Sequence, residues 1–86
     1  MVDVMGLSGA KHHFDRVDGT TAIDVWSDTT LEERHIIGFY TKMGDCGYRD
    51  GKIIASNSTP KARELARSYN IELVDFQGNP HRDFSQ

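Results

Sequence analysis

The chain has 86 residues, of which 37% are hydrophobic and 27% charged, a composition typical of one small domain with one core. Its formal net charge of -3 argues against a nucleic-acid binder that works by bulk electrostatics, but leaves room for a local basic patch. Cys46 is the single cysteine, no apolar run approaches the ~20 residues that span a bilayer, and the N-terminus lacks a signal-peptide pattern. We therefore expect a cytoplasmic protein without a membrane partner.

The N-terminal third predicts two antiparallel strands joined by a tight turn. Residues 1–9 indicate a short strand or an extended arm that ends in a turn. Residues 12–17 then alternate in the manner of a strand, and residues 20–26 form a second β-favouring segment. Asp18 and Gly19 separate the two segments and are typical of a hairpin turn.

Two acids, Asp15 and Asp24, lie on the two strands of this expected hairpin. With the expected turn, Asp15 lies opposite Ala22 and diagonal to Asp24, so the two acids can share a metal ion if both point to one face. Carboxylate oxygens suit Mg²⁺ or Mn²⁺. One interpretation is therefore a weak Mg²⁺ or Mn²⁺ site at these two residues. The alternative is a pair of solvated carboxylates with no cofactor.

A helix is predicted near residues 30–44. Two overlapping capping boxes, which begin at Thr29 and Thr30, favour its start at these threonines. Glycines near the other end favour a stop between Met43 and Gly47. One face of the helix is apolar and carries Ile36, Phe39, Tyr40 and Met43.

The C-terminal half predicts a strand, a helix and a strand over residues 52–56, 60–69 and 71–76. Thr59 is a good N-cap for this helix, and Asn70 can take the left-handed conformation that ends it. The apolar face that we expect to be buried against the sheet comprises Ala62, Leu65, Ala66 and Tyr69. Such a unit places its two strands side by side and parallel.

These elements together predict an α/β fold with a mixed four-stranded sheet and two main helices, in the order β-β-α-β-α-β. Residues 1–76 are expected to form a single domain. Residues 77–86 carry glycine, proline and polar residues and are expected to form a flexible tail.

Three segments of the chain resemble a known superfamily. The segments are "LSGAKHHFDRV", "AIDVWSD" and "GKIIASNSTPKARELARSYNIELVD". They resemble the restriction-endonuclease-like superfamily, particularly the Mrr-type nucleases and a related set of small archaeal domains. The resemblance implies a restriction-endonuclease-like core.

The superfamily's active enzymes carry an acid on one strand, then an acid, any residue and a lysine on the next. The acids hold a divalent metal, and the lysine helps to activate water. By this resemblance Asp15 and Asp24 match the acids, whereas Trp26 stands where the lysine should be. A neutral indole can neither orient a hydroxide nor stabilise charge on a phosphorane, so the catalytic motif is degenerate. In some relatives a neighbouring helix supplies the basic residue, which implies Lys42 as the substitute and Lys11 as the second choice.

Four residues are candidates for contact with nucleic acid: Lys11, His13, Arg63 and Arg67. His13 shares a strand face with Asp15, and the two arginines lie one turn apart on the second predicted helix. The alternative for each residue is an ordinary solvated surface position.

The resemblance and the Trp26 departure together predict a catalytically inactive domain that acts as a nucleic-acid-binding or assembly module. Its expected partner is DNA or RNA, or else a partner protein. One alternative is a metal-dependent nuclease that uses Asp15 and Asp24 with Lys42. A second alternative is a homodimeric structural domain without a ligand.

Overall fold

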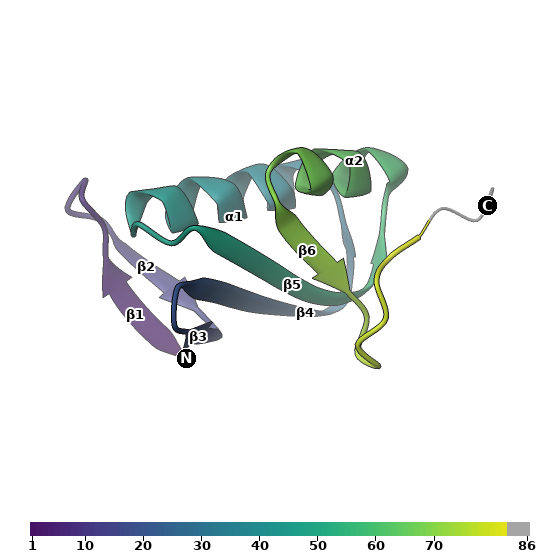
Figure 1. The fold of residues 1–86 in the computed structure, drawn as a ribbon, viewed down its shortest axis with the longest axis horizontal. Coiled ribbons are helices and arrows are strands. Elements are labelled where there is room, and N and C mark those ends of the chain that lie inside the picture. The colour runs from purple at the N-terminus through teal and green to yellow at the C-terminus, as the bar shows by residue number, and fades with distance from the viewer. Residues whose placement is uncertain (83–86) are drawn as a thin grey trace.

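Eight strands and helices follow one another along residues 1–82, which are the residues that the computed structural model describes. In chain order they are β1 (Val2–Met5), β2 (Lys11–Phe14), β3 (Arg16–Asp18), β4 (Thr21–Leu31), α1 (Glu33–Asp45), β5 (Asp50–Ser58), α2 (Pro60–Ser68) and β6 (Ile71–Val74) (Figure 1). The predicted α/β class, with a mixed four-stranded sheet and two helices, is confirmed.

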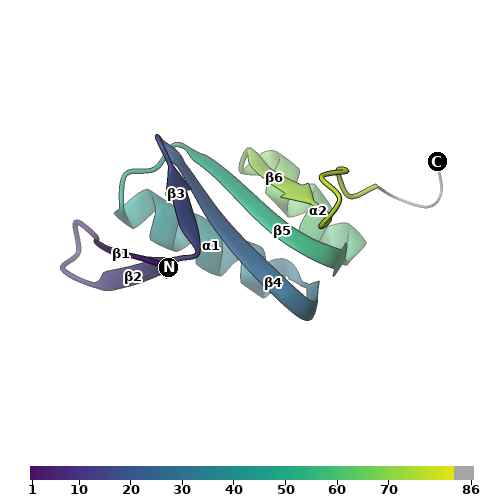
Figure 2. The same ribbon diagram turned by 90° about the horizontal axis from the view of Figure 1, so that it is seen from below.

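The main sheet has the strand order β3-β4-β5-β6. β3 and β4 are antiparallel, whereas β4 and β5, and β5 and β6, are parallel pairs. Both helices lie on one face of this sheet, and the opposite face carries no helix (Figures 1 and 2). β1 and β2 form a separate antiparallel pair beside the end at which α1 finishes (Figure 1).

The predicted register of the second hairpin is wrong. Val17 pairs with Ala22, so the turn residues are Gly19 and Thr20 rather than Asp18 and Gly19. Gly19 has φ of +63°, and glycine is the residue that a type II′ turn favours at its first central position. Continuing this register places Asp15 directly opposite Asp24 rather than diagonal to it.

Residues 12–17 are also not one strand. β2 pairs with β1, β3 pairs with β4, and Asp15 lies between them. The Asp15 carboxylate accepts the N–H of Val25 at 2.8 Å, so a side chain takes the place of a backbone acceptor there. This substitution lets the chain change sheets at Asp15 without leaving a β4 donor unpaired.

The predicted start of the first helix at Thr29 or Thr30 is wrong. β4 continues through Leu31, which is fully buried, and its pairing with β5 resumes after an irregularity between Trp26 and Thr30. Glu32 is the N-cap instead. Pairing with β5 and burial of Leu31 outweigh the local capping signal. The end of α1 at Asp45 lies inside the predicted interval.

The second helix begins and ends as its local sequence predicts. The Thr59 hydroxyl oxygen accepts the N–H of Ala62 at 3.1 Å, and Asn70 has φ of +58°. The flanking strands β5 and β6 are neighbours and parallel, as expected. Leu65 was expected to be buried, but it is only half-buried. The contact between α2 and the sheet is made by two small residues, Ala62 and Ala66, which let the helix approach closely.

The core lies between the helices and the sheet. Its largest fully buried side chains are those of Phe14, Leu31, Ile36 and Ile53. Gly51 permits the close approach of α1 to β5, because a Cβ there would lie 2.6 Å from the Phe39 ring and 2.8 Å from the Met43 sulfur. Packing of Phe39 and Met43 over Gly51 brings the C-terminal half of α1, and with it Lys42, close to the sheet.

Part of the segment expected as a flexible tail folds back on the sheet. The His81 N–H donates to Leu73 O at 3.1 Å, and the Asp75 N–H donates to Asn79 O at 2.8 Å. Residues 83–86 of that expected tail lie outside the described residues. Within residues 1–82, neither helix has the length and apolar character needed to cross a membrane.

Candidate functional site

A buried ion pair between β4 and α1 is the centre of the site. Asp24 is 6% exposed and lies on the β4 face that α1 covers. The Lys42 Nζ lies 2.5 Å from Asp24 Oδ2 and also donates to His13 O at 2.6 Å. Two residues that are 18 positions apart in the sequence therefore share one ion pair.

Two aromatic rings surround the Lys42 ammonium group. Its nitrogen lies 4.6 Å from the centroid of Phe14 and 5.7 Å from that of Phe39. These distances fit cation–π interactions. The charge of Lys42 is thus partly shielded from water, and a carboxylate, a carbonyl and two rings balance it. Such a pair is stable only when both partners are present, because either charge alone would remain desolvated.

Asp15 completes the group of predicted residues. Its N–H donates to Asp24 Oδ1 at 3.1 Å, while its own Oδ2 accepts from the Val25 N–H at 2.8 Å. The structure therefore brings Asp15, Asp24 and Lys42 together, as the nuclease hypothesis requires. Both oxygens of Asp24 already have hydrogen-bond partners, and Asp15 uses one oxygen to hold β4.

Divalent metal binding at these acids would require Lys42 to leave Asp24. Among residues 1–82, no group of three or more histidine, cysteine or acidic side chains is placed to hold a metal ion. Two carboxylates are the ligands at hand, and an ammonium group contacts Oδ2 of one of them, Asp24. This donor set suits a protonated amine better than a hydrated Mg²⁺, which needs several free oxygens.

Two adjoining hollows meet at Asp24, Trp26 and Lys42, and we call them together the β4 groove. The smaller hollow, of about 250 Å³, also includes His13 and Asp15. The larger hollow, of about 630 Å³, extends along α1, and its further lining residues are Thr29, Arg34, His35, Gly38 and Phe39. Trp26 stands between the two.

On the α1 side of this groove, sequence reasoning identified Lys42 but missed Arg34, His35 and Gly38. Arg34, Gly38 and Lys42 recur at every fourth position, so they form one stripe along the helix. That spacing was a usable signal. The spacing identifies one wall of a site only when the start of α1 and its contact with β4 are known.

The nucleic-acid candidates are distributed over three places. His13 lines the smaller hollow, and its ring pairs with the Asp3 carboxylate. Lys11 begins β2 and is exposed. Arg63 and Arg67 lie on α2, where Arg63 donates to Ser58 O at 2.5 Å and Arg67 is exposed. The two arginines line hollows at β5, β6 and residues 80–81 and do not line the β4 groove.

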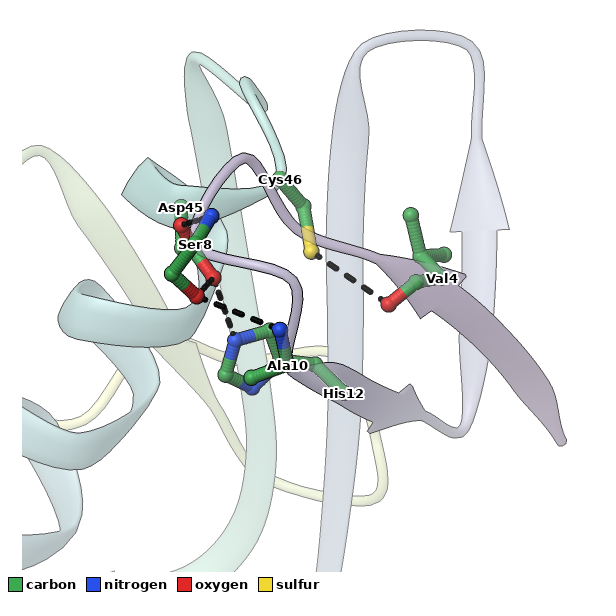
Figure 3. Close-up of polar contacts among 6 residues, drawn as sticks. All are labelled: Val4, Ser8, Ala10, His12, Asp45 and Cys46. Atoms are coloured by element: carbon green, nitrogen blue, oxygen red, sulfur yellow. Dashed lines mark hydrogen bonds and ion pairs between the residues drawn. The ribbon is translucent and has the colours of Figure 1, made fainter.

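A hydrogen-bonded clasp holds the β1–β2 hairpin against the end of α1 (Figure 3). The Asp45 carboxylate accepts from the Ser8 N–H at 2.9 Å and the Ser8 hydroxyl at 2.6 Å, and pairs with His12 Nε2 at 2.8 Å. Gly6 is required at this contact, because a Cβ there would lie 1.9 Å from Asp45 Oδ2. The clasp fixes β2, which supplies His13 O and the Phe14 ring to Lys42.

The clasp lowers the pKa of Asp45, and the pKa of the neighbouring Cys46 thiol is also shifted. The Ser8 hydroxyl, then the His12 ring and the Ser8 N–H, lower the pKa of Asp45 below its ordinary value of 3.8. Burial, followed by the nearby Asp45 charge, raises the pKa of the Cys46 thiol. Cys46 accordingly behaves as a neutral thiol, and its Sγ lies 3.8 Å from Val4 O (Figure 3).

Comparison of the chain with protein-family models, curated proteins and solved structures finds no match. The class of the protein therefore rests on its fold and its site alone. It is an α/β domain with an acid–lysine pair buried under a groove beside β4.

Proposed function

We propose that this protein is a non-catalytic nucleic-acid-binding module built on a restriction-endonuclease-like core. The observation that carries the proposal is the contact between the Lys42 ammonium group and Asp24, at 2.5 Å. In an active enzyme of that superfamily a divalent metal would neutralise this acid. Here a covalently attached cation does so.

Two features support the absence of catalysis. Asp24 has no oxygen left without a partner, so a metal must compete with both Lys42 and the Asp15 N–H. Trp26 stands where the superfamily's lysine activates water, and an indole carries no charge with which to stabilise a phosphorane. Metal-dependent hydrolysis would thus have to displace the pair of Asp24 and Lys42, which engages both the carboxylate and the ammonium group.

The arrangement of the acids supports the superfamily assignment. Asp24 lies on β4, and the register of β3 and β4 extends to place Asp15 opposite it. A strand, a helix and a further strand follow, with β4, β5 and β6 parallel. This is the order of acids, helix and strands that the resemblance implies.

Nucleic acid is the partner that the groove favours. Arg34 contributes positive charge, and the acid of the larger hollow, Asp24, is already neutralised by Lys42. A ligand that brings negative charge and hydrogen-bond acceptors fits such a surface better than a cationic one.

The metal-dependent nuclease remains the second candidate, because Asp15, Asp24 and Lys42 do converge. It requires substrate or metal to draw Lys42 away from Asp24, after which the ammonium group could stabilise transition-state charge.

The test combines cleavage and binding assays. Purified protein with Mg²⁺ or Mn²⁺ should show no cleavage of single- or double-stranded DNA or RNA above background. Fluorescence anisotropy with the same labelled molecules should show saturable binding that weakens as salt rises. Cleavage that disappears in both Asp24→Asn and Lys42→Ala, while circular dichroism shows both variants to be folded, would establish the nuclease instead. Failure to bind any of these nucleic acids would contradict the proposal.

A further inference from the structure

The larger hollow of the β4 groove has the size and composition of a ligand site. Its volume of about 630 Å³ falls within the range of small-molecule sites. Trp26 is 36% exposed, and its ring makes a T-shaped contact with the His35 ring at 4.9 Å. The hollow therefore contains an accessible aromatic surface held by a neighbouring ring.

Gly38 opens the α1 side of this hollow. It lies in the middle of an exposed helical turn, where glycine weakens a helix relative to alanine. A Cβ at this position would meet no atom within 4 Å, so no contact inside the protein requires glycine. What the missing side chain provides is space beside Trp26, on the same wall as Arg34 and Lys42.

Two polar side chains of the hollow, those of His35 and Arg34, present donors to it. The N-cap N–H of Glu32 donates to His35 Nδ1 at 2.9 Å, so the ring proton of a neutral His35 resides on Nε2. The Arg34 guanidinium is largely exposed, and its 3.6 Å contact with Glu32 is a weak surface pair that a ligand can replace. Asp24 already accepts one hydrogen bond at each oxygen, one of them from the Lys42 ammonium group. A ligand that supplies acceptors of its own fits the exposed donors of the hollow.

We propose that this hollow binds single-stranded nucleic acid, with one unpaired base stacked on the Trp26 indole and the adjoining phosphate at Arg34. The inference rests on the proposed nucleic-acid-binding function and specifies its ligand. Every base has a π face that can stack on an aromatic side chain, and a base in a duplex keeps its faces covered by its neighbours. Asp15 beside the smaller hollow repels phosphate, which places the backbone on the Arg34 side of Trp26.

Trp26 is the one tryptophan of the chain, so its fluorescence reports on the site directly. Titration with a 15-nucleotide oligo(dT) should quench this fluorescence and reach saturation, whereas the matched duplex should leave it nearly unchanged. Anisotropy of the labelled oligonucleotide should show that Trp26→Leu weakens binding roughly 5- to 150-fold, the effect of losing one base stack, while Trp26→Phe retains most of the affinity.

Gly38→Leu provides a steric test with a matched control. It should fill the hollow and weaken oligo(dT) binding at least tenfold without lowering the melting temperature, because leucine favours helix. Gly44→Leu makes the same exchange elsewhere on α1, also where a Cβ meets nothing within 4 Å, and Gly44 does not line the hollow. Binding of this control should equal that of the parent.

The outcomes separate the two proposals. Binding of duplex and single strand with equal affinity, without a change in Trp26 fluorescence, would overturn the base-stacking site while leaving a nucleic-acid-binding module in place. Equal affinities of Gly38→Leu and Gly44→Leu for oligo(dT) would also overturn it. Absence of binding to any DNA or RNA in the anisotropy assay would instead remove the proposed function itself.

Discussion

At Lys42, a single side chain decides the chemistry of the candidate site. Its four methylene groups reach from α1 to β4 between the rings of Phe14 and Phe39, and its ammonium group meets Asp24. A divalent metal ion would bring twice that charge but would need open coordination positions. Lysine supplies its charge without needing open coordination positions. This arrangement favours ligand binding over metal-dependent hydrolysis.

Lys42→Met should show how strongly the fold depends on this charge. The exchange keeps a long apolar side chain but leaves the Asp24 carboxylate buried without its cation. We expect the free energy of unfolding, measured by urea denaturation at neutral pH, to fall by about 3 kcal/mol. The double variant Asp24→Asn/Lys42→Met should recover much of the loss, because neither remaining group is charged. A single variant as stable as the parent would show that the pair is not desolvated.

At the scale of the element, the β1–β2 hairpin is attached to the rest of the protein through few polar contacts. The Asp45 carboxylate receives three of them, two from Ser8 and one from His12. Because Asp45 is the last residue of α1, its negative charge is unfavourable beside the negative end of the helix dipole. The donors of the hairpin offset that cost, so the clasp should depend on pH.

The Asp45→Asn variant tests this dependence. A pKa lowered in the folded protein means that the ionised carboxylate stabilises the fold. Its contribution is present above the ordinary value of 3.8 and is lost as pH falls through the lower folded value. The variant should therefore melt below the parent at pH 6, and the difference should shrink as pH falls below 3.8. A difference that stays constant into the acid range would contradict this assignment.

At the scale of the whole molecule, one thin core stabilises a sheet that carries helices on one face only (Figure 2). Domains of this size are stable by roughly 5 to 15 kcal/mol, so single core contacts matter. β5 is an inner strand of the sheet, and its Ile53 and Ala55 are fully buried in this core.

Ile53→Ala should cost about 2 to 5 kcal/mol of unfolding free energy, because it removes a fully buried side chain and leaves a cavity. Leu65→Ala should cost clearly less, since Leu65 is half-buried at the edge of the core. Chemical denaturation of both variants under one set of conditions compares them directly. Equal losses would mean that the α2 face contributes more to packing than its burial indicates.

The sequence by itself determined the elements whose ends depend on local chemistry. Thr59 starts α2 and Asn70 ends it through groups a few residues away, so no tertiary information is needed. The parallel unit around that helix and the α/β class followed from the same patterns. Candidate residues Asp15, Asp24 and Lys42 were also identifiable, because each carries a chemistry that a resemblance can point to.

Only the tertiary structure decided how these residues meet. A shift of the turn by one residue moved Asp15 from diagonal to opposite Asp24, and hairpin register depends on the turn geometry that the folded chain adopts. The N-cap of α1 moved from Thr29 or Thr30 to Glu32 because β4 continued to pair with β5. Both shifts come from contacts between distant segments. The ion pair of Lys42 and the open wall at Gly38 arise from the same packing of α1 on β4, which no local pattern encodes.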